Sequence, residues 1–254
     1  MHFDIVGLLF AVAVCAGIVD GVAGGGGLIT LPVLMIAGLP PAQALATNKI
    51  QALASVASSA HRFTRAGIVN LPSMKWKILI SAIGAGVGAY LVRIVDSSIL
   101  GKIAPVLLIC IALFFMLSRN LTKHQRRKRV SEGLFTLAAV LPIAFYDGFF
   151  GPGTGTIYVA AFVLLLGRNL PQATAETKVL NATGSAIAAI IFLPGGFIAW
   201  PAALAMSAGG IIGGQIGAML AIRWGSSFIR VALVMVSIAL AVRLLFQYQD
   251  FLRF

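Results

Sequence analysis

Apolar segments follow one another along almost the whole 254-residue chain, and only short polar or Gly/Pro-rich clusters interrupt them. Hydrophobic residues make up 59% of the chain and charged residues only 10%. A soluble domain has about a quarter of its residues charged, and a disordered chain is more polar still. The pattern therefore excludes both classes and predicts an all-α polytopic membrane protein. We expect membrane segments at about residues 3–19, 27–38, 42–60, 75–95, 99–118, 132–147, 154–167, 171–193, 201–222 and 227–247.

The first half of the sequence returns in the second half. The glycine-rich motif that begins at Asp20 reappears at Asp147, 127 residues later, and Lys49 reappears as Lys178 at an offset of 129. Internal duplication of this kind decides the architecture of many transporters. The sequence thus predicts three regions, namely a first transmembrane repeat over 1–118, a basic linker over 119–130 and a second transmembrane repeat over 131–254.

Five apolar segments in each half would make the two repeats inverted with respect to the membrane, because five is odd. Most loop lysines and arginines then lie on the side of the 119–130 linker, as the positive-inside rule requires of the cytoplasmic side. We therefore expect a cytoplasmic linker and extracytoplasmic termini, with the basic charge serving orientation and not nucleic-acid binding. The alternative has four crossings per half, with the short segments 27–38 and 154–167 re-entrant, and the charge distribution disfavours it only slightly.

Of the 19 lysines and arginines, 17 lie in loops or near the ends of the apolar segments, and the two that remain are Lys49 and Lys178. A lysine at the centre of a span costs about 2.5–3.5 kcal/mol to insert, so a matched pair points to a role in facing an anion. The alternative is that each lysine reaches an interface or bonds backbone carbonyls of a broken helix. Polar neighbours that can donate hydrogen bonds to an oxyanion surround both, namely Thr47, Asn48, Gln51, Thr177 and Asn181.

Two glycine-rich runs cannot be ordinary helix interior, because glycine costs about 1 kcal/mol there relative to alanine and proline about 3. Exposed backbone at membrane depth survives only against protein or a watery cavity. The short helices that follow would direct their free N-terminal amides at an anion. Close helix packing is the alternative here, and it is the favoured interpretation of Gly84-x-x-x-Gly88 and Gly213-x-x-x-Gly217. The predicted site residues in the two runs are Gly24, Gly25, Gly26, Gly27, Gly151, Gly153, Thr154, Gly155 and Thr156.

Three acidic residues accompany these features. Asp20 and Asp147 directly precede the two breaks and would either cap the broken helices or accept a coupling proton. Glu176 would neutralise Lys178 or carry a proton. The sequence contains no HExxH, GxSxG or Walker motif, so we expect no catalytic residues, no metal site and no cofactor.

The Gly-rich run Asp20–Gly27 followed by Leu31-Pro32, the triplet Thr47-Asn48-Lys49, and the echo at Asp147-Gly148 with Thr177-Lys178-x-x-Asn181 resemble the TauE/SafE family of sulfite-exporting permeases. The resemblance covers nearly the whole chain. It implies transport of sulfite, sulfoacetate or related sulfonates, usually as export, across a bacterial inner membrane. Pro152, Thr154 and Thr156 interrupt the glycines of the second run and leave the anion open.

The sequence as a whole predicts a secondary transporter with alternating access, whose partners are a small anion and the lipid bilayer. An anion channel and a membrane-embedded enzyme are the alternatives. The oligomeric state has no signal in the sequence. Because each buried lysine costs free energy to insert, we expect its replacement by alanine to weaken transport while leaving folding intact.

Overall fold

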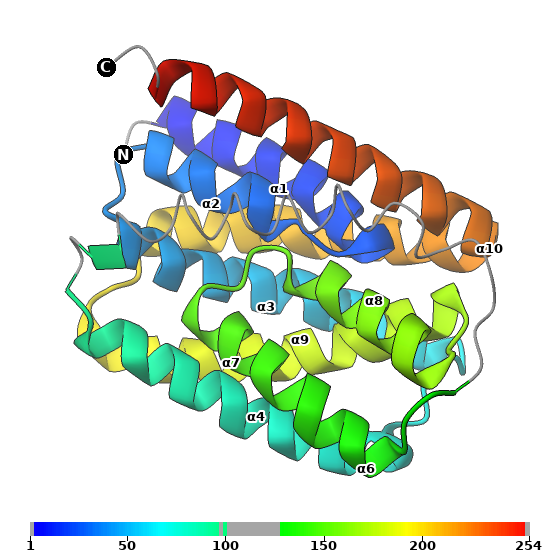
Figure 1. Cartoon of the computed structure of the whole chain (residues 1–254). Coiled ribbons are helices and arrows are strands. Elements are labelled where there is room, and N and C mark those ends of the chain that lie inside the picture. Colours follow the sequence, from blue (N-terminus) through cyan, green and yellow to red (C-terminus); the bar gives the residue numbers. More distant parts are fainter. Residues whose placement is uncertain (1–2, 97–98, 101–127, 252–254) are drawn as a thin grey trace.

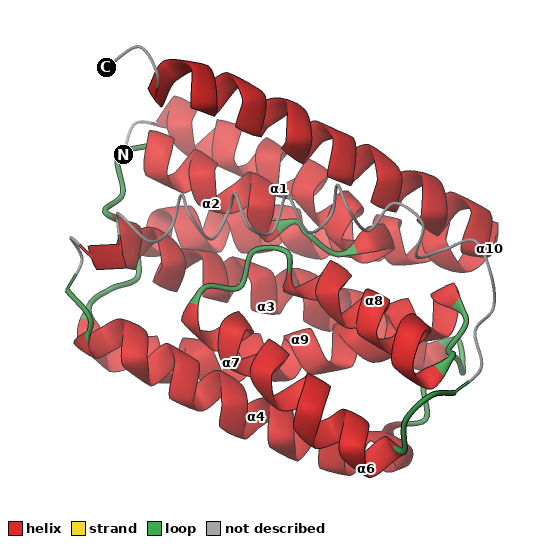
Figure 2. Ribbon diagram, in the orientation of Figure 1, coloured by secondary structure: helices red, strands yellow, loops and turns green. Residues whose placement is uncertain are grey.

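The computed structural model describes residues 3–96, 99–100 and 128–251, and the side chains of 3–4 and 226–251 are outside this description. All regular structure in these residues is helical, which confirms the all-α prediction for them (Figures 1 and 2). Residues 101–118 of the predicted segment 99–118 and residues 119–127 of the linker lie outside the described residues. The elements are α1 (Phe3–Ala23), α2 (Gly27–Ile36), α3 (Pro41–Arg65), α4 (Leu71–Ile94), α6 (Glu132–Phe135), a π-helical turn (Thr136–Val140), α7 (Leu141–Phe149), α8 (Thr154–Leu166), α9 (Leu170–Phe192), a 3-10 turn (Leu193–Gly195) and α10 (Trp200–Phe251).

Five stretches of the described chain are long and apolar enough to cross a membrane, namely Ile5–Ala23, Leu71–Ile94, Glu132–Phe149, Leu170–Gly195 and Trp200–Gly225. The helices α2 and α8 are shorter, with 10 and 13 residues. With its 25 residues α3 is long enough, but its inward polar side chains lower its hydropathy. The predicted segments 201–222 and 227–247 both fall in α10, which changes direction at Gly225 (φ 62°, ψ −150°).

Two helical hairpins reach the middle of the bundle. In Figure 1, α2 runs back toward the end of the bundle at which α1 begins, and α8 runs back toward the end at which α6 begins. Hydrogen bonds fix the second return, because the amide of Arg129 donates to the carbonyl of Leu165 at 2.8 Å and Arg168 pairs with Glu132 at 3.1 Å. The two hairpins therefore enter the bundle from opposite ends.

Helices from the two halves of the sequence are interleaved. The first part of α10 packs mainly against α1 and α3, while α4 packs mainly against α7 and α9. Contacts between α3 and α9 join these two groups. The groups α1/α2/α3/α10 and α4/α6/α7/α8/α9 thus each combine elements of both halves.

Glycines allow the closest of these contacts. A Cβ atom on Gly84 would lie 2.7 Å from the carbonyl oxygen of Leu141, and one on Gly21 would lie 2.9 Å from the Cα atom of Gly217. Gly88 and Gly213 likewise face backbone of α7 and α1. The interpretation of both GxxxG motifs as close helix packing is confirmed, and the repeat-related motifs serve the α4–α7 and α10–α1 contacts.

Basic side chains and their acidic partners gather at one end of the bundle. Lys77 on α4 and Arg168 before α9 both pair with Glu132, at 2.7 and 3.1 Å, and Arg168 also pairs with Glu176 at 3.1 Å. The start of α1 and the end of α10 lie at the opposite end in Figure 1. By the positive-inside rule we expect the end with Glu132 to be the cytoplasmic one.

A reporter that is active only in the cytoplasm tests this orientation. Fused after Phe254 it is expected to be inactive, and inserted at Gly67, in the loop between α3 and α4, it is expected to be active. Measured activities normalised to protein level give the comparison. Activity at both positions would place the termini and the basic end on the same side and support the four-crossing alternative.

Candidate functional site

The two helix breaks predicted from the glycine runs are present, and they touch each other. Gly24 and Gly25 (φ +75° and +112°) separate α1 from α2, and Gly151 and Gly153 (φ +96° and +84°) separate α7 from α8. These backbone conformations favour glycine. The hydroxyl of Thr156 donates to the carbonyl oxygens of Ala23 and Gly24, at 3.2 and 3.1 Å. The second break is thereby fixed against the first.

Each intramembrane lysine is paired with an aspartate from the other half of the sequence. The Nζ atom of Lys49 donates to the backbone carbonyl of Asp147 and lies 3.1 Å from Asp147 Oδ1. Lys178 makes the same pair of contacts with Asp20, at 3.2 Å from Oδ2. The two lysine side chains are 2% and 0% exposed. Both cations are therefore neutralised within the bundle, and each pair joins one helix group to the other.

Of the acidic residues, Glu176 has a different partner from the one expected from the sequence. Glu176 pairs with Arg168 at the basic end, so the expectation that it neutralises Lys178 is wrong. Asp20 fits the predicted capping role, since its Oδ1 atom accepts from the amides of Gly25 and Gly26 at 3.1 and 3.3 Å. The partner of Lys178 is Asp20, which is 158 residues away in the sequence, so no local sequence pattern connects the two.

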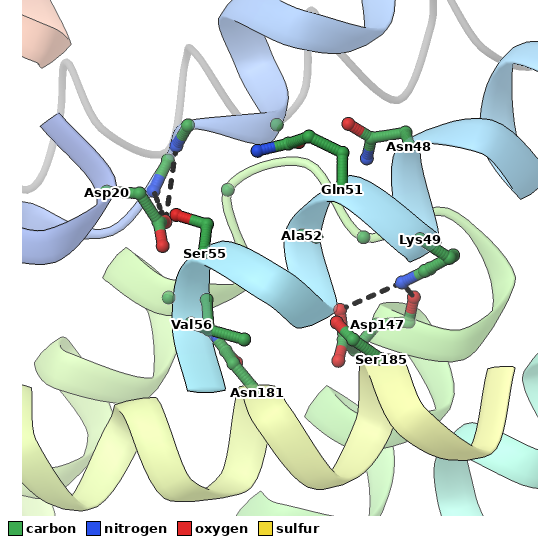
Figure 3. A pocket seen from close by; sticks show the side chains of 16 residues that line it. Asp20, Asn48, Lys49, Gln51, Ala52, Ser55, Val56, Asp147, Asn181 and Ser185 are labelled. Carbon is green, nitrogen blue, oxygen red and sulfur yellow. Dashed lines mark hydrogen bonds and ion pairs between the residues drawn. The ribbon is translucent and has the colours of Figure 1, made fainter. Parts of the chain in front are cut away.

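A cavity of about 40 Å³ lies between the breaks and the helices α3 and α9. Figure 3 shows Asn48, Gln51 and Ser55 of α3 on one side, with Asn181 and Ser185 of α9 across from them. Both Asp20 and Asp147 line it. Of the residues predicted for substrate binding, the cavity is lined by Gly25, Gly26, Gly27, Asn48, Lys49, Gln51, Gly151, Gly153, Gly155 and Asn181.

The other predicted residues lie around the cavity without lining it. Thr47 accepts a hydrogen bond from the amide of Ala199 at 3.0 Å, and Thr154 donates to the carbonyl of Gly151 at 2.5 Å. Lys178 contacts Asp20, which lines the cavity. The residues that the structure leaves outside the lining are Gly24, Thr47, Thr154, Thr156, Thr177 and Lys178.

Polar groups aimed at the cavity include both donors and acceptors. Thr30 contacts Asn48 Oδ1 at 2.5 Å, which leaves the amide NH₂ of Asn48 to donate near Gly27. The NH₂ of Asn181 lies near Gly155 at the start of α8. Within the described part of the chain, Asp147 Oδ2 and Asn181 Oδ1 are buried without a hydrogen-bond partner. The cavity thus has free hydrogen-bonding capacity of both kinds.

Four lining residues were not predicted: Ala52, Ser55, Val56 and Ser185. The signal for two of them is present in the sequence, because Ser55 follows Gln51 by four residues and Ser185 follows Asn181 by four. Such spacing continues a polar stripe along one helix face. Among the described residues, no three His, Cys, Asp or Glu side chains come together as metal ligands.

A bundle of apolar helices around two broken hairpins, with a polar cavity at their meeting point, is the architecture of a membrane transporter. The TauE family model, described as "Sulfite exporter TauE/SafE", matches residues 9–244. The chain belongs to this family.

Bacterial proteins named as probable membrane transporters are similar to the chain over nearly their whole length. It is 42% identical to YfcA of Escherichia coli K12, covering 95% of this chain and 90% of that protein. It is 44% identical to ORF9 of a Sinorhizobium species, with 96% and 94% covered, and 41% identical to a protein of Haemophilus influenzae, with 96% and 95% covered. No solved structure gives a significant match. The protein is a multi-pass transporter of the bacterial inner membrane.

Proposed function

We propose that the protein is a secondary transporter that moves small sulfur-containing anions, such as sulfite, sulfoacetate or similar sulfonates, outward across the inner membrane. The observation that carries this proposal is the cavity at the meeting point of the two breaks. It combines the cation of Lys49, the amide groups of Asn48, Gln51 and Asn181, and one glycine in the first turn of each short helix, Gly27 of α2 and Gly155 of α8.

These groups suit an oxyanion because each can donate to oxygen. Gly27 is the first residue of α2, so its N–H has no acceptor within that helix, and a helix N-terminus favours negative charge. The NH₂ groups of Asn48 and Asn181 lie beside the first turns of α2 and α8. Lysine adds a compact point charge with three donors. An anion in the cavity would therefore meet donors from four helices.

The size of the cavity supports a small ligand. A volume of about 40 Å³ has room for about three water molecules, since one water needs roughly 10–15 Å³ on this measure. A compact oxyanion of a few heavy atoms fits such a space after displacing the water. The TauE/SafE name of the family supports sulfite as the first anion to test.

We further propose that the two halves are inverted repeats and that access alternates by a relative movement of the two interleaved helix groups. The repeat-related pairs Lys49–Asp147 and Lys178–Asp20, and the opposite entry of the two hairpins, support the inversion. Because the helices of the two halves are interleaved, a movement of one sequence half against the other would break the α1–α10 and α4–α7 contacts. The moving parts are instead α1/α2/α3/α10 and α4/α6/α7/α8/α9, with the cavity between α3 and α9.

Binding and counterflow test the proposal. The purified protein is screened by thermal shift against sulfite, sulfate, thiosulfate and methanesulfonate, and the anion that stabilises it most is then used in proteoliposomes. We expect external anion to accelerate release of labelled internal anion, which is the behaviour of a carrier and not of a channel.

Asn181→Ala is expected to reduce the anion affinity about ten- to a hundredfold, because a hydrogen bond to a charged group contributes about 1.5–3 kcal/mol. Thr183→Ala is the matched control on the same helix, since Thr183 bonds only the carbonyl of Val179 and does not line the cavity.

Absence of stabilisation and flux with all four anions of the thermal-shift screen would refute the proposed substrate class.

A further inference from the structure

The two repeat-related ion pairs differ in their surroundings. Asp20 accepts hydrogen bonds from two backbone amides in addition to its contact with Lys178, and Lys178 does not reach the cavity. Asp147 accepts from Lys49 on its Oδ1 atom and has the Thr154 hydroxyl close by, but no backbone amide donates to it, and its Oδ2 atom is buried without a hydrogen-bond partner. Lys49 and Asp147 both line the cavity. The Lys178–Asp20 pair is therefore held in place by additional hydrogen bonds, whereas a ligand in the cavity can replace Asp147 as the partner of Lys49.

We propose that the Lys49–Asp147 pair couples anion transport to proton transport, an inference that rests on the proposed function. An entering anion replaces the Asp147 carboxylate as the partner of Lys49, and Asp147 takes up one proton. The pair Lys178–Asp20 remains intact throughout and holds the two breaks together. The transporter would thus carry one proton with each monovalent anion in the same direction.

Charge balance requires this proton. In the empty site the Lys49 cation and the Asp147 anion cancel, and a monovalent anion on Lys49 would leave Asp147 as a buried, uncompensated carboxylate. Such a charge is costly away from water. A proton from the aqueous side to which the cavity is open restores neutrality, and the site then holds the cation, the anion and a neutral carboxyl group. Release of the anion on the other side returns the proton there and re-forms the ion pair.

Among the described groups around Asp147, none is a better proton acceptor than its own carboxylate. Asp20 on α1 lines the same cavity but is engaged by two amides and Lys178. On α7 itself the Tyr146 hydroxyl donates to the carbonyl of Pro152 at 2.6 Å, and on α8 the Tyr158 hydroxyl donates to the carbonyl of Val140 at 3.3 Å. The neighbouring helices α4 and α9 present Ala85 and Gly184. Lys49 on α3 is the cation that contacts the carboxylate.

Proton uptake on binding tests the inference in the wild-type protein. Methanesulfonate and sulfite are added to the purified transporter in weakly buffered solution, and the protons taken up per anion bound are counted with a pH indicator. Methanesulfonate keeps one charge across the range used, so its apparent affinity is expected to fall up to tenfold for each unit of rising pH. Binding without proton uptake, at an affinity that does not change with pH, would overturn the inference and leave the proposed function standing.

Two matched variants assign the proton to one carboxyl group. Asp147→Asn is expected to take up one proton fewer per anion bound than the wild type and to lose flux driven by a pH gradient. Asp20→Asn is expected to lower thermal stability but to keep the wild-type proton count. The comparison with the wild type removes the proton that sulfite itself exchanges. Proton coupling retained in Asp147→Asn, or lost in Asp20→Asn alone, would overturn the assignment.

Discussion

Lys49→Met is expected to unfold at a much lower temperature than the wild type and to lose transport. The substitution leaves the Asp147 carboxylate buried, with Oδ1 deprived of its partner and Oδ2 already without one. Breaking a buried ion pair by removing one partner costs about 3–5 kcal/mol. The sequence alone led to the expectation that removing the lysine leaves folding intact, and the pairing with Asp147 is the reason for the different expectation here.

The double variant Lys49→Met/Asp147→Asn separates stability from function. Removing both charges is often neutral for stability, so we expect it to recover most of the lost unfolding temperature but none of the anion-dependent proton uptake. Lys75→Met is the control, because Lys75 is an exposed residue of α4 over Trp76 and its loss should change neither quantity. Unfolding temperatures in detergent and flux in proteoliposomes provide the measurements. Normal stability and flux in Lys49→Met would refute the pairing as the basis of the site.

Gly24→Ala is expected to abolish transport and to destabilise the protein by forcing the two breaks apart. A Cβ atom at Gly24 would lie 2.7 Å from the carbonyl carbon of Gly155, closer than real Cβ atoms come to backbone. Neither backbone can yield by a rotamer change, and overpacking of this kind costs about 1–3 kcal/mol. The left-handed conformation of Gly24 adds about 1 kcal/mol.

Gly67→Ala is the matched control for this steric effect. Gly67 has nearly the same φ (+71° against +75°), but its Cβ atom would meet nothing within 4 Å. It therefore reports the backbone strain without the clash, and we expect a small loss of stability with transport preserved. Equal losses in the two variants, measured by unfolding temperature and counterflow, would show that contact between the breaks is unimportant.

The helix breaks and the membrane class could be predicted from the sequence because both depend on local properties. Apolar length fixes which segments enter a membrane, and a run such as Gly24–Gly27 cannot remain helical whatever surrounds it. Duplication of Lys49 as Lys178 marked the two helices, α3 and α9, that face the cavity. The polar stripe on α3 was detectable as far as Gln51, and the same periodicity extends it to Ser55.

The inverted relation of the halves and the roles of the site residues remain predictions, for which the geometry supplies new support. The Lys49–Asp147 pair joins residues 98 positions apart, and no spacing rule connects them. Glu176 shows the same limit, because its neighbour in sequence, Lys178, is two positions along the helix and faces elsewhere. Its ion pair forms with Arg168 at the end of the bundle.

The sequence by itself determined that this chain is a helical membrane protein with two glycine breaks and two lysine-bearing helices, since hydropathy and backbone preference act over a few residues. The tertiary structure alone decided which aspartate neutralises which lysine, which of the predicted residues line the cavity, and how the helices of the two halves interleave. These features depend on helix packing through close glycine contacts between distant segments. In a buried site, helix packing decides which groups lie within about 3 Å of a charge. Those groups determine whether the ion pair stays intact or a ligand can replace one partner.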